Sequence, residues 1–196
     1  MPPRLSQGPT KREVDGAWGC LLSAQTIPRG PAARILLASE VRHRRAAQAA
    51  RVLRAAARDA LAALGLRGCE LSVTLVSDRT IRRLNRSWRG KDRSTDVLAF
   101  PQGGTKGSPG PIGDVVISLH TALRQAEEGG WGLSRELRRL LAHGLLHCLG
   151  YDHETPAEAR RMARAEQRLL GREGMVGAAL TDAAPQRKRT ARRKRP

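Results

Sequence analysis

Three histidines at fixed spacing, with a glycine before the third, constrain this chain more than any other feature of its sequence. The segment HGLLHCLGYDH covers residues 143–153 and places His147 four residues after His143. On a helix, residues four apart lie on one face about 6 Å apart, so both imidazoles can bind one ion. Gly150 is suited to end that helix in a left-handed turn, and His153 can then fold back as a third ligand.

Three neutral imidazoles leave one coordination position of a tetrahedral ion open for water, which is typical of catalytic rather than structural zinc. We therefore predict one Zn²⁺ per chain, bound by His143, His147 and His153. The other two histidines, His43 and His120, have no partners at ligand spacing. They are expected to be ordinary surface or packed residues.

The cysteines favour a reducing compartment. Cys20, Cys69 and Cys148 are widely spaced and form no CxxC pair, so neither a disulfide framework nor a cysteine zinc knuckle is predicted. Cys148 is expected to be small and buried, because a helix turns its side chain about 100° away from that of His147. Since no apolar run approaches the roughly 20 residues of a membrane span and no signal pattern is present, we expect a cytoplasmic protein without membrane association.

The charge balance points to a polyanionic partner. The chain has 36 Lys and Arg against 18 Asp and Glu, a net charge of +18, and such an excess suits nucleic acid because basic side chains neutralise phosphates. The segment 79–93 alone holds seven basic residues and one acid, Asp92. The alternative is a surface that is rich in arginine and has no specific partner.

A chain of 196 residues is long enough for one domain with extensions. Residues 1–30 are predicted to be a flexible N-terminal extension and residues 179–196 a disordered basic tail, with the folded domain at 31–178. Strands are expected at 35–37, 71–75, 97–100 and 115–118. Helices are expected at 43–64, 78–88, 134–149 and from 155 onward, with Asp78 and Ser134 as caps and a capping box at Thr155. The order βαβαββααα predicts an α+β fold with a small mixed sheet and the HxxxH pair on a central helix.

The histidine spacing matches the long zincin pattern H-E-x-x-H-x-x-G-x-x-H at all positions but one. Gly144 stands where a metalloprotease has the glutamate that activates water. Its absence argues against peptide hydrolysis.

With glycine at that position, the segment resembles the signature of the YbeY family, metal-dependent endoribonucleases of ribosomal RNA maturation. Residues 85–101 are similar to that family's N-x-x-[YW]-R-x-x-D-x-x-T-D-V-L-[SA]-F-P block, and residues 112–118 to its L-G-D-I-x-I-[CS] strand. The likeness spans about residues 33–175.

The resemblance implies a single zincin-like domain that cleaves single-stranded RNA. It further implies action on the 3′ end of 16S ribosomal RNA and in ribosome quality control, with ribosomal RNA and the small subunit as partners. His143, His147 and His153 match the family's metal ligands, and Arg89 matches its functional arginine. Arg89 and His143 thus form the expected catalytic set.

Several alternatives stay open. The chain can instead be a non-catalytic, zinc-stabilised ribosome assembly factor that binds ribosomal RNA, or, less favoured, a metallopeptidase. Without the family resemblance, Arg89 would be interpreted as a solvated surface arginine. Asp152 can act as a general base, as a partner of a ligand histidine or as a turn cap. The general base and the oligomeric state are not predicted.

Overall fold

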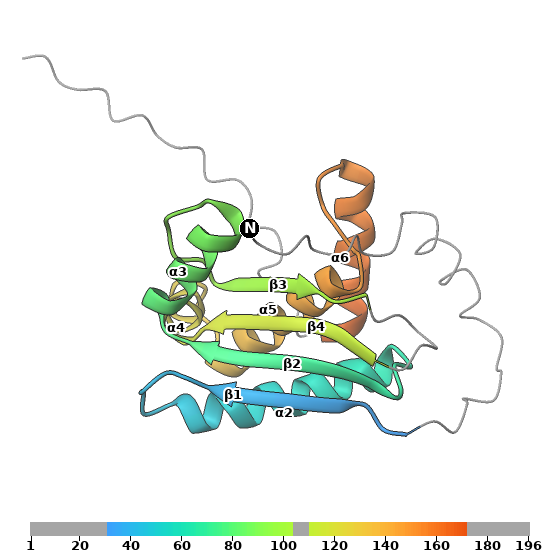
Figure 1. Cartoon of the computed structure of the whole chain (residues 1–196), viewed down its shortest axis with the longest axis horizontal. Coiled ribbons are helices and arrows are strands. Elements are labelled where there is room, and N and C mark those ends of the chain that lie inside the picture. The colour runs from blue at the N-terminus through green and yellow to red at the C-terminus, as the bar shows by residue number, and fades with distance from the viewer. Residues whose placement is uncertain (1–30, 104–109, 172–196) are drawn as a thin grey trace, which may run out of the picture.

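Four strands form one mixed sheet in the computed structural model of this chain, which describes residues 31–103 and 110–171. In sheet order they are β1 (Arg34–Ser39), β2 (Cys69–Val76), β4 (Gly110–Ser118) and β3 (Val97–Pro101). β1, β2 and β4 run parallel, and β3 runs antiparallel to β4 at one edge of the sheet (Figure 1). The mixed sheet is as predicted.

Five helices in the described residues complete the domain: α2 (Ala46–Ala63), α3 (Asp78–Arg89), α4 (Leu119–Glu128), α5 (Leu133–Cys148) and α6 (Pro156–Leu170). The element order is the expected βαβαββααα. The sequence had given no range for α4, which begins directly after β4. The predicted extension 1–30 and basic tail 179–196 lie outside the described residues, so these boundaries stay predictions. Within the described ranges, none of the helices combines the length and apolarity that crossing a bilayer requires.

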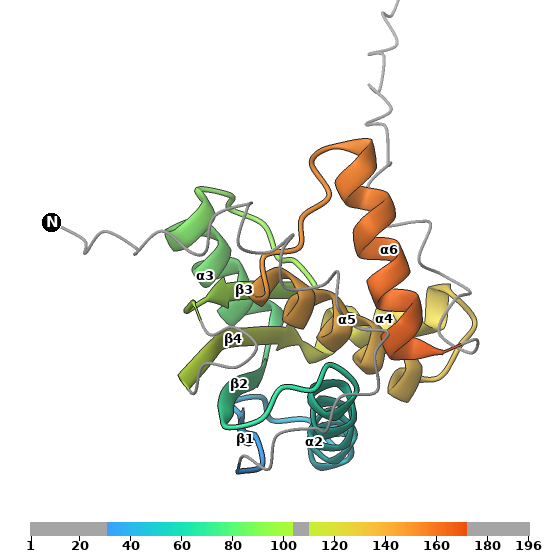
Figure 2. The ribbon, with the colours of Figure 1, turned by 90° about the vertical axis from the view of Figure 1, so that its right-hand side faces the viewer.

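The alternation of side chains in the strands decides which helices cover which face. Leu71, Val73 and Leu75 of β2 are fully buried on the face covered by α2 and α5, and they belong to the main core. A smaller cluster on the opposite face packs Leu98 and Val116 against Ile81 of α3. Figure 2 shows α3 alone on one side of the sheet, with α2, α4, α5 and α6 on the other.

Two predicted caps are wrong. Helix α3 is capped by Ser77, whose hydroxyl accepts the backbone N–H of Thr80 at 3.2 Å. The Asp78 carboxylate instead accepts hydrogen bonds from α4, including one from the Thr121 hydroxyl at 2.8 Å. Helix α5 begins after Gly132 without a side-chain cap, so Ser134 lies within its first turn. In contrast, the capping box of Thr155 with Glu158 is present at the start of α6.

Strand β4 is longer than the predicted 115–118. Its residues from Gly110 onward pair with β2 from Cys69 onward, so tertiary pairing extends the strand through residues of low strand propensity. Gly113 permits close packing there, because a Cβ at this position would lie 2.5 Å from the carbonyl oxygen of Phe100 and 2.8 Å from Cys148 Sγ. This packing holds the end of α5 against the edge of the sheet.

Candidate metal centre

The last two turns of α5 present His143 and His147 on one face, just before the helix ends. Gly150 adopts the left-handed conformation with φ of 80°, as expected. The N–H of Gly150 donates to the carbonyl of His147 at 3.0 Å, and the N–H of Tyr151 donates to the carbonyl of Leu146 at 3.0 Å. The chain reverses there and brings His153 back to the two helical histidines.

The three imidazoles form one cluster. The Nε2 atoms of His143 and His147 are 3.1 Å apart, and the three ring centroids are separated by 4.6, 5.2 and 5.7 Å. One nitrogen from each of His143, His147 and His153 lies within 4.8 Å of the others. A zinc ion with bonds of about 2.0–2.1 Å spaces its ligand nitrogens by about 3.4 Å. The donor set and the spacing on α5 therefore fit a single ion.

The environment of His147 keeps its ring neutral. Burial is the largest cause, and the neighbouring His143 and His153 add to it, so that the pKa of His147 falls from 6.5 to about 4. The charge of Arg89 lowers this pKa further, while that of Asp152 raises it. A neutral imidazole offers its lone pair to a cation without first releasing a proton.

Glu166 of α6 is a site residue that sequence analysis missed. Its Oε1 atom lies 2.7 Å from Nδ1 of His143. A carboxylate that accepts a hydrogen bond from the Nδ1–H group keeps the proton on Nδ1, which leaves the Nε2 lone pair free to face a metal. Residues 152–166 contain four acids at different distances along the chain, and the packing of α6 on α5 selects the one that reaches His143.

Asp152 makes the contact expected of a turn cap. Its Oδ1 atom accepts the backbone N–H of His153 at 2.8 Å. Of the three roles left open for Asp152, the turn cap is the one that this hydrogen bond supports, and the bond holds the backbone that carries the third histidine.

Arg89 comes to this centre from the other side of the sheet. It is the last residue of α3, which ends at Gly90 with φ of 67°. Its exposed guanidinium is close enough to lower the pKa of His147 by charge. α3, which ends at Arg89, and α5, which carries His143 and His147, lie on opposite sides of edge strand β3 (Figure 2).

Gly144 faces the sheet. A Cβ at this position would lie 2.7 Å from Val115 Cγ1 and 3.2 Å from Val97 Cγ2. The helix therefore packs too closely on β3 and β4 for a longer side chain here, and a glutamate would not fit without a shift of α5. The packing explains why this position holds no catalytic carboxylate.

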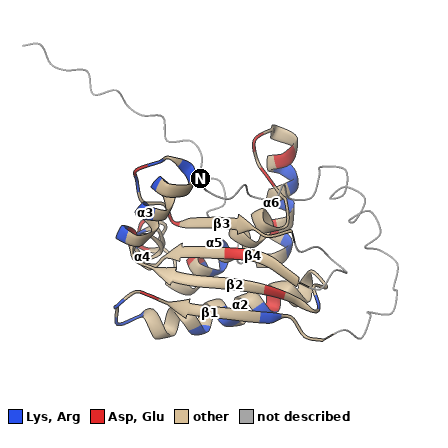
Figure 3. Cartoon of the chain, in the orientation of Figure 1, with Lys and Arg blue, Asp and Glu red and all other residues tan. Residues whose placement is uncertain are grey.

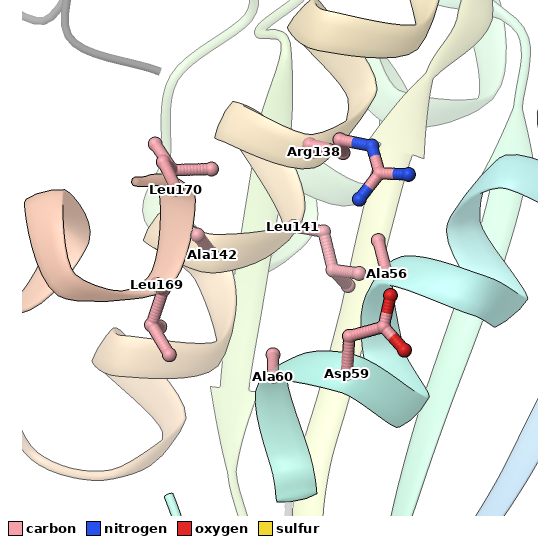
Figure 4. A pocket seen from close by; sticks show the side chains of 8 residues that line it. All are labelled: Ala56, Asp59, Ala60, Arg138, Leu141, Ala142, Leu169 and Leu170. Carbon is pink, nitrogen blue, oxygen red and sulfur yellow. The ribbon is translucent and has the colours of Figure 1, made fainter. Parts of the chain in front are cut away.

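The remaining candidates lie outside the cluster. His43 and His120 pack against each other edge to face, with centroids 5.8 Å apart. Cys148 is buried, and burial raises the pKa of its thiol to about 12. A cavity of about 50 Å³ between α2, α5 and α6 has the side chains of Asp59 and Arg138 at its rim and none of the clustered histidines in its lining (Figure 4).

The sequence profile of the family described as Endoribonuclease YbeY matches residues 38–174 of this chain. The chain belongs to the endoribonuclease YbeY family. The matched range includes Arg89, Gly144, Glu166 and the three clustered histidines. The family membership predicted from the histidine signature is thus confirmed.

Two relatives that carry the family name agree with this assignment. A protein named Endoribonuclease YbeY from Anaeromyxobacter sp. (strain Fw109-5) is 56% identical over 153 residues, which are 78% of this chain and 79% of that protein. A YbeY relative from Myxococcus xanthus (strain DK1622) is also 56% identical, over 77% of this chain and 53% of its own length. The solution structure of TM1509 from Thermotoga maritima covers 78% of this chain at 23% identity, with a TM-score of 0.46.

Proposed function

We propose that this chain is a zinc-dependent endoribonuclease that cleaves single-stranded RNA, with one Zn²⁺ held by His143, His147 and His153. The observation that carries the proposal is the cluster of three imidazoles with a guanidinium acting on it electrostatically. When bound, the ion supplies a Lewis acid that polarises a phosphoryl oxygen and lowers the pKa of water. Membership of the endoribonuclease YbeY family supports RNA as the substrate.

The protein's own residues divide the remaining work. Glu166 accepts a hydrogen bond from the Nδ1–H group of His143 and so orients that ligand. Arg89 would hold a non-bridging phosphate oxygen, because a guanidinium stays charged and can donate two parallel hydrogen bonds to a phosphate. Charge builds up on the phosphate during cleavage, so this contact would be stronger in the transition state than in the bound substrate. Arg89 and His143 are therefore the proposed catalytic pair.

We further propose ribosomal RNA of the small subunit as the physiological substrate, cut at the 3′ end of 16S RNA during maturation and in ribosome quality control. The cytoplasm and the small ribosomal subunit are the proposed location and partner. The net charge of +18 supports a polyanionic partner. Figure 3 shows basic residues on α3 and on the loop that follows it.

A cleavage assay with purified full-length protein tests the activity. We expect cutting of single-stranded RNA that stops with a chelator, returns with Zn²⁺ and is lost in His147→Ala. Arg89→Ala should slow cleavage about 10²- to 10³-fold, the usual effect of removing one donor to a developing charge. Arg54→Ala, an exposed arginine of α2, is the matched control and should leave the rate unchanged.

Ribosomal RNA from cells that carry only His147→Ala separates enzyme from assembly factor. Unprocessed 16S 3′ ends are expected if cleavage is the function. Normal ends, with the variant folded and ribosome-associated, would instead support the non-catalytic assembly factor. The peptidase alternative is disfavoured by the packing of Gly144, and turnover of a peptide library would be needed to revive it.

A further inference from the structure

Trp88 is an exposed indole in the last turn of α3. Its side chain is 55% exposed, and in the described residues only Leu36 of β1, at 44%, is a comparably exposed large apolar side chain. Tryptophan is usually largely buried, so an exposed indole indicates a surface that contacts something else. In the sequence analysis this residue served as the end of the helix predicted at 78–88 and as part of the family block.

The indole is held in place from beneath. Phe100 of β3 lies edge to face with it, with ring centroids 5.7 Å apart and planes at 68°. Phe100 itself packs against the small core cluster of Ile81, Leu98 and Val116. The Trp88 ring therefore rests on a rigid support while more than half of its surface stays open, which lowers the entropy lost when a flat ligand stacks on it.

The charges around Trp88 suit a nucleic acid strand. It directly precedes Arg89, whose charge reaches the histidine cluster, and six more basic residues lie between positions 79 and 93. The single acid of this segment, Asp92, is already bound by Arg82 through hydrogen bonds of 2.9 and 3.0 Å. Basic side chains beside an aromatic platform are the combination that binds single strands, where phosphates are neutralised and bases stack.

We infer that the Trp88 indole is a stacking platform for an unpaired nucleobase of the RNA whose phosphate is held by Arg89. This inference rests on the proposed function and gives it a physical source of strand selectivity. A base in a duplex keeps both faces stacked on its neighbours and cannot lie on the indole, whereas an unpaired base can. Because stacking is tolerant of sequence, the platform selects single strands without reading a base.

The test measures RNA binding by the zinc-loaded full chain. A fluorescein-labelled short single-stranded RNA is mixed with protein in a stopped-flow instrument, and anisotropy is read before cleavage proceeds. Trp88→Ala should weaken binding between about fivefold and a hundredfold, the range that loss of one stacked base produces. Trp88→Phe should restore most of the affinity, and the matched control Leu36→Ala, at the opposite edge of the sheet, should change nothing.

An RNA with abasic nucleotides in place of its central bases identifies the cause. Wild type and Trp88→Ala should bind this RNA equally, because its phosphates remain and its bases are gone. The inference would be overturned if Trp88→Ala weakened the binding of intact and abasic RNA equally, or if it weakened the binding of neither. Thermal unfolding of each variant excludes a folding defect.

Cleavage measured on the same preparations separates this inference from the proposed function. If wild type cuts nothing while binding still depends on Trp88 and on the bases, the stacking platform is supported and the proposed nuclease activity is wrong. If wild type cuts RNA and Trp88→Ala binds and cuts as well as wild type, the nuclease activity is supported and the stacking platform is wrong.

Discussion

At the scale of single residues, Glu166 decides which nitrogen of His143 is offered to a cation. A neutral histidine ring exchanges between two tautomers in water, and the 2.7 Å contact of the Glu166 carboxylate with Nδ1 favours the one that carries its proton on Nδ1. The partner ring of His147 is kept neutral mainly by burial. The surroundings thus favour the Nδ1-protonated tautomer of His143 and a neutral ring at His147.

We expect Glu166→Gln and Glu166→Ala to weaken zinc binding by about 10- to 100-fold, because the orientation of His143 is no longer fixed by a charged acceptor. Competition with a chromophoric chelator measures this directly and does not depend on RNA cleavage. Glu128→Gln, an exposed glutamate of α4, is the control. Wild-type affinity in Glu166→Ala would show that the contact does not support the site.

At the scale of elements, the distance between α5 and the sheet is set by Gly144. This helix carries two of the three clustered histidines, and its glycine lies over Val115 of β4 and Val97 of β3. A glycine in the middle of a helix normally weakens it by about 1 kcal/mol relative to alanine. Here that cost is offset by the close packing that a missing side chain permits.

Gly144→Ala should therefore destabilise the protein, although the same change stabilises most helices. Overpacking costs about 1–3 kcal/mol against a propensity gain of about 1 kcal/mol, so we expect a net loss of up to about 2 kcal/mol in denaturant unfolding. Val115→Ala removes the Cγ1 methyl group that would lie 2.7 Å from the new Cβ at position 144. The double variant should be more stable than the sum of the two single changes predicts, and a stabilised Gly144→Ala would contradict the packing argument.

At the scale of the whole molecule, a buried ion network fastens the site-bearing helix to its neighbours. Arg139 of α5 is 11% exposed, and its Nε lies 3.1 Å from Glu136 Oε1 in the same helix. Its Nη2 lies 3.7 Å from Oδ2 of Asp96, the residue just before β3. Asp96 also accepts a hydrogen bond from Gln125 of α4 at 3.1 Å. Burial by itself would lower the pKa of Arg139, but the hydrogen bonds to Glu136 and the charges of Glu136, Asp96 and Glu166 outweigh it and raise that pKa.

Arg139→Met should cost about 3–5 kcal/mol of unfolding free energy, because it leaves the buried carboxylate of Glu136 without its cation. Chemical denaturation measures the loss. Adding Glu136→Gln should recover much of it, since a neutral amide still accepts the hydrogen bond from Trp131 Nε1. The neighbouring exposed Arg138→Ala should stay within about 0.5 kcal/mol of wild type. A similar loss in Arg138→Ala would rule out the buried pair as the cause.

The sequence by itself determined the features that depend on neighbours along the chain. The histidine cluster follows from helical spacing and the left-handed turn at Gly150, all within eleven residues. The capping box of α6 and the alternation of β2 are equally local, and they were predicted correctly. The element order follows from the same periodicities.

Only the tertiary structure decided the features that depend on packing between distant segments. Glu166 is one of several acids that the chain offers, and the docking of α6 selects it. The sequence indicates only that Gly144 lacks the carboxylate of a metalloprotease, whereas the fold shows that Gly144 packs closely against the sheet. Ser77 caps α3 instead of Asp78, because the Asp78 carboxylate is hydrogen-bonded to α4. Each of these outcomes depends on which surfaces meet, and local spacing carries no information about that.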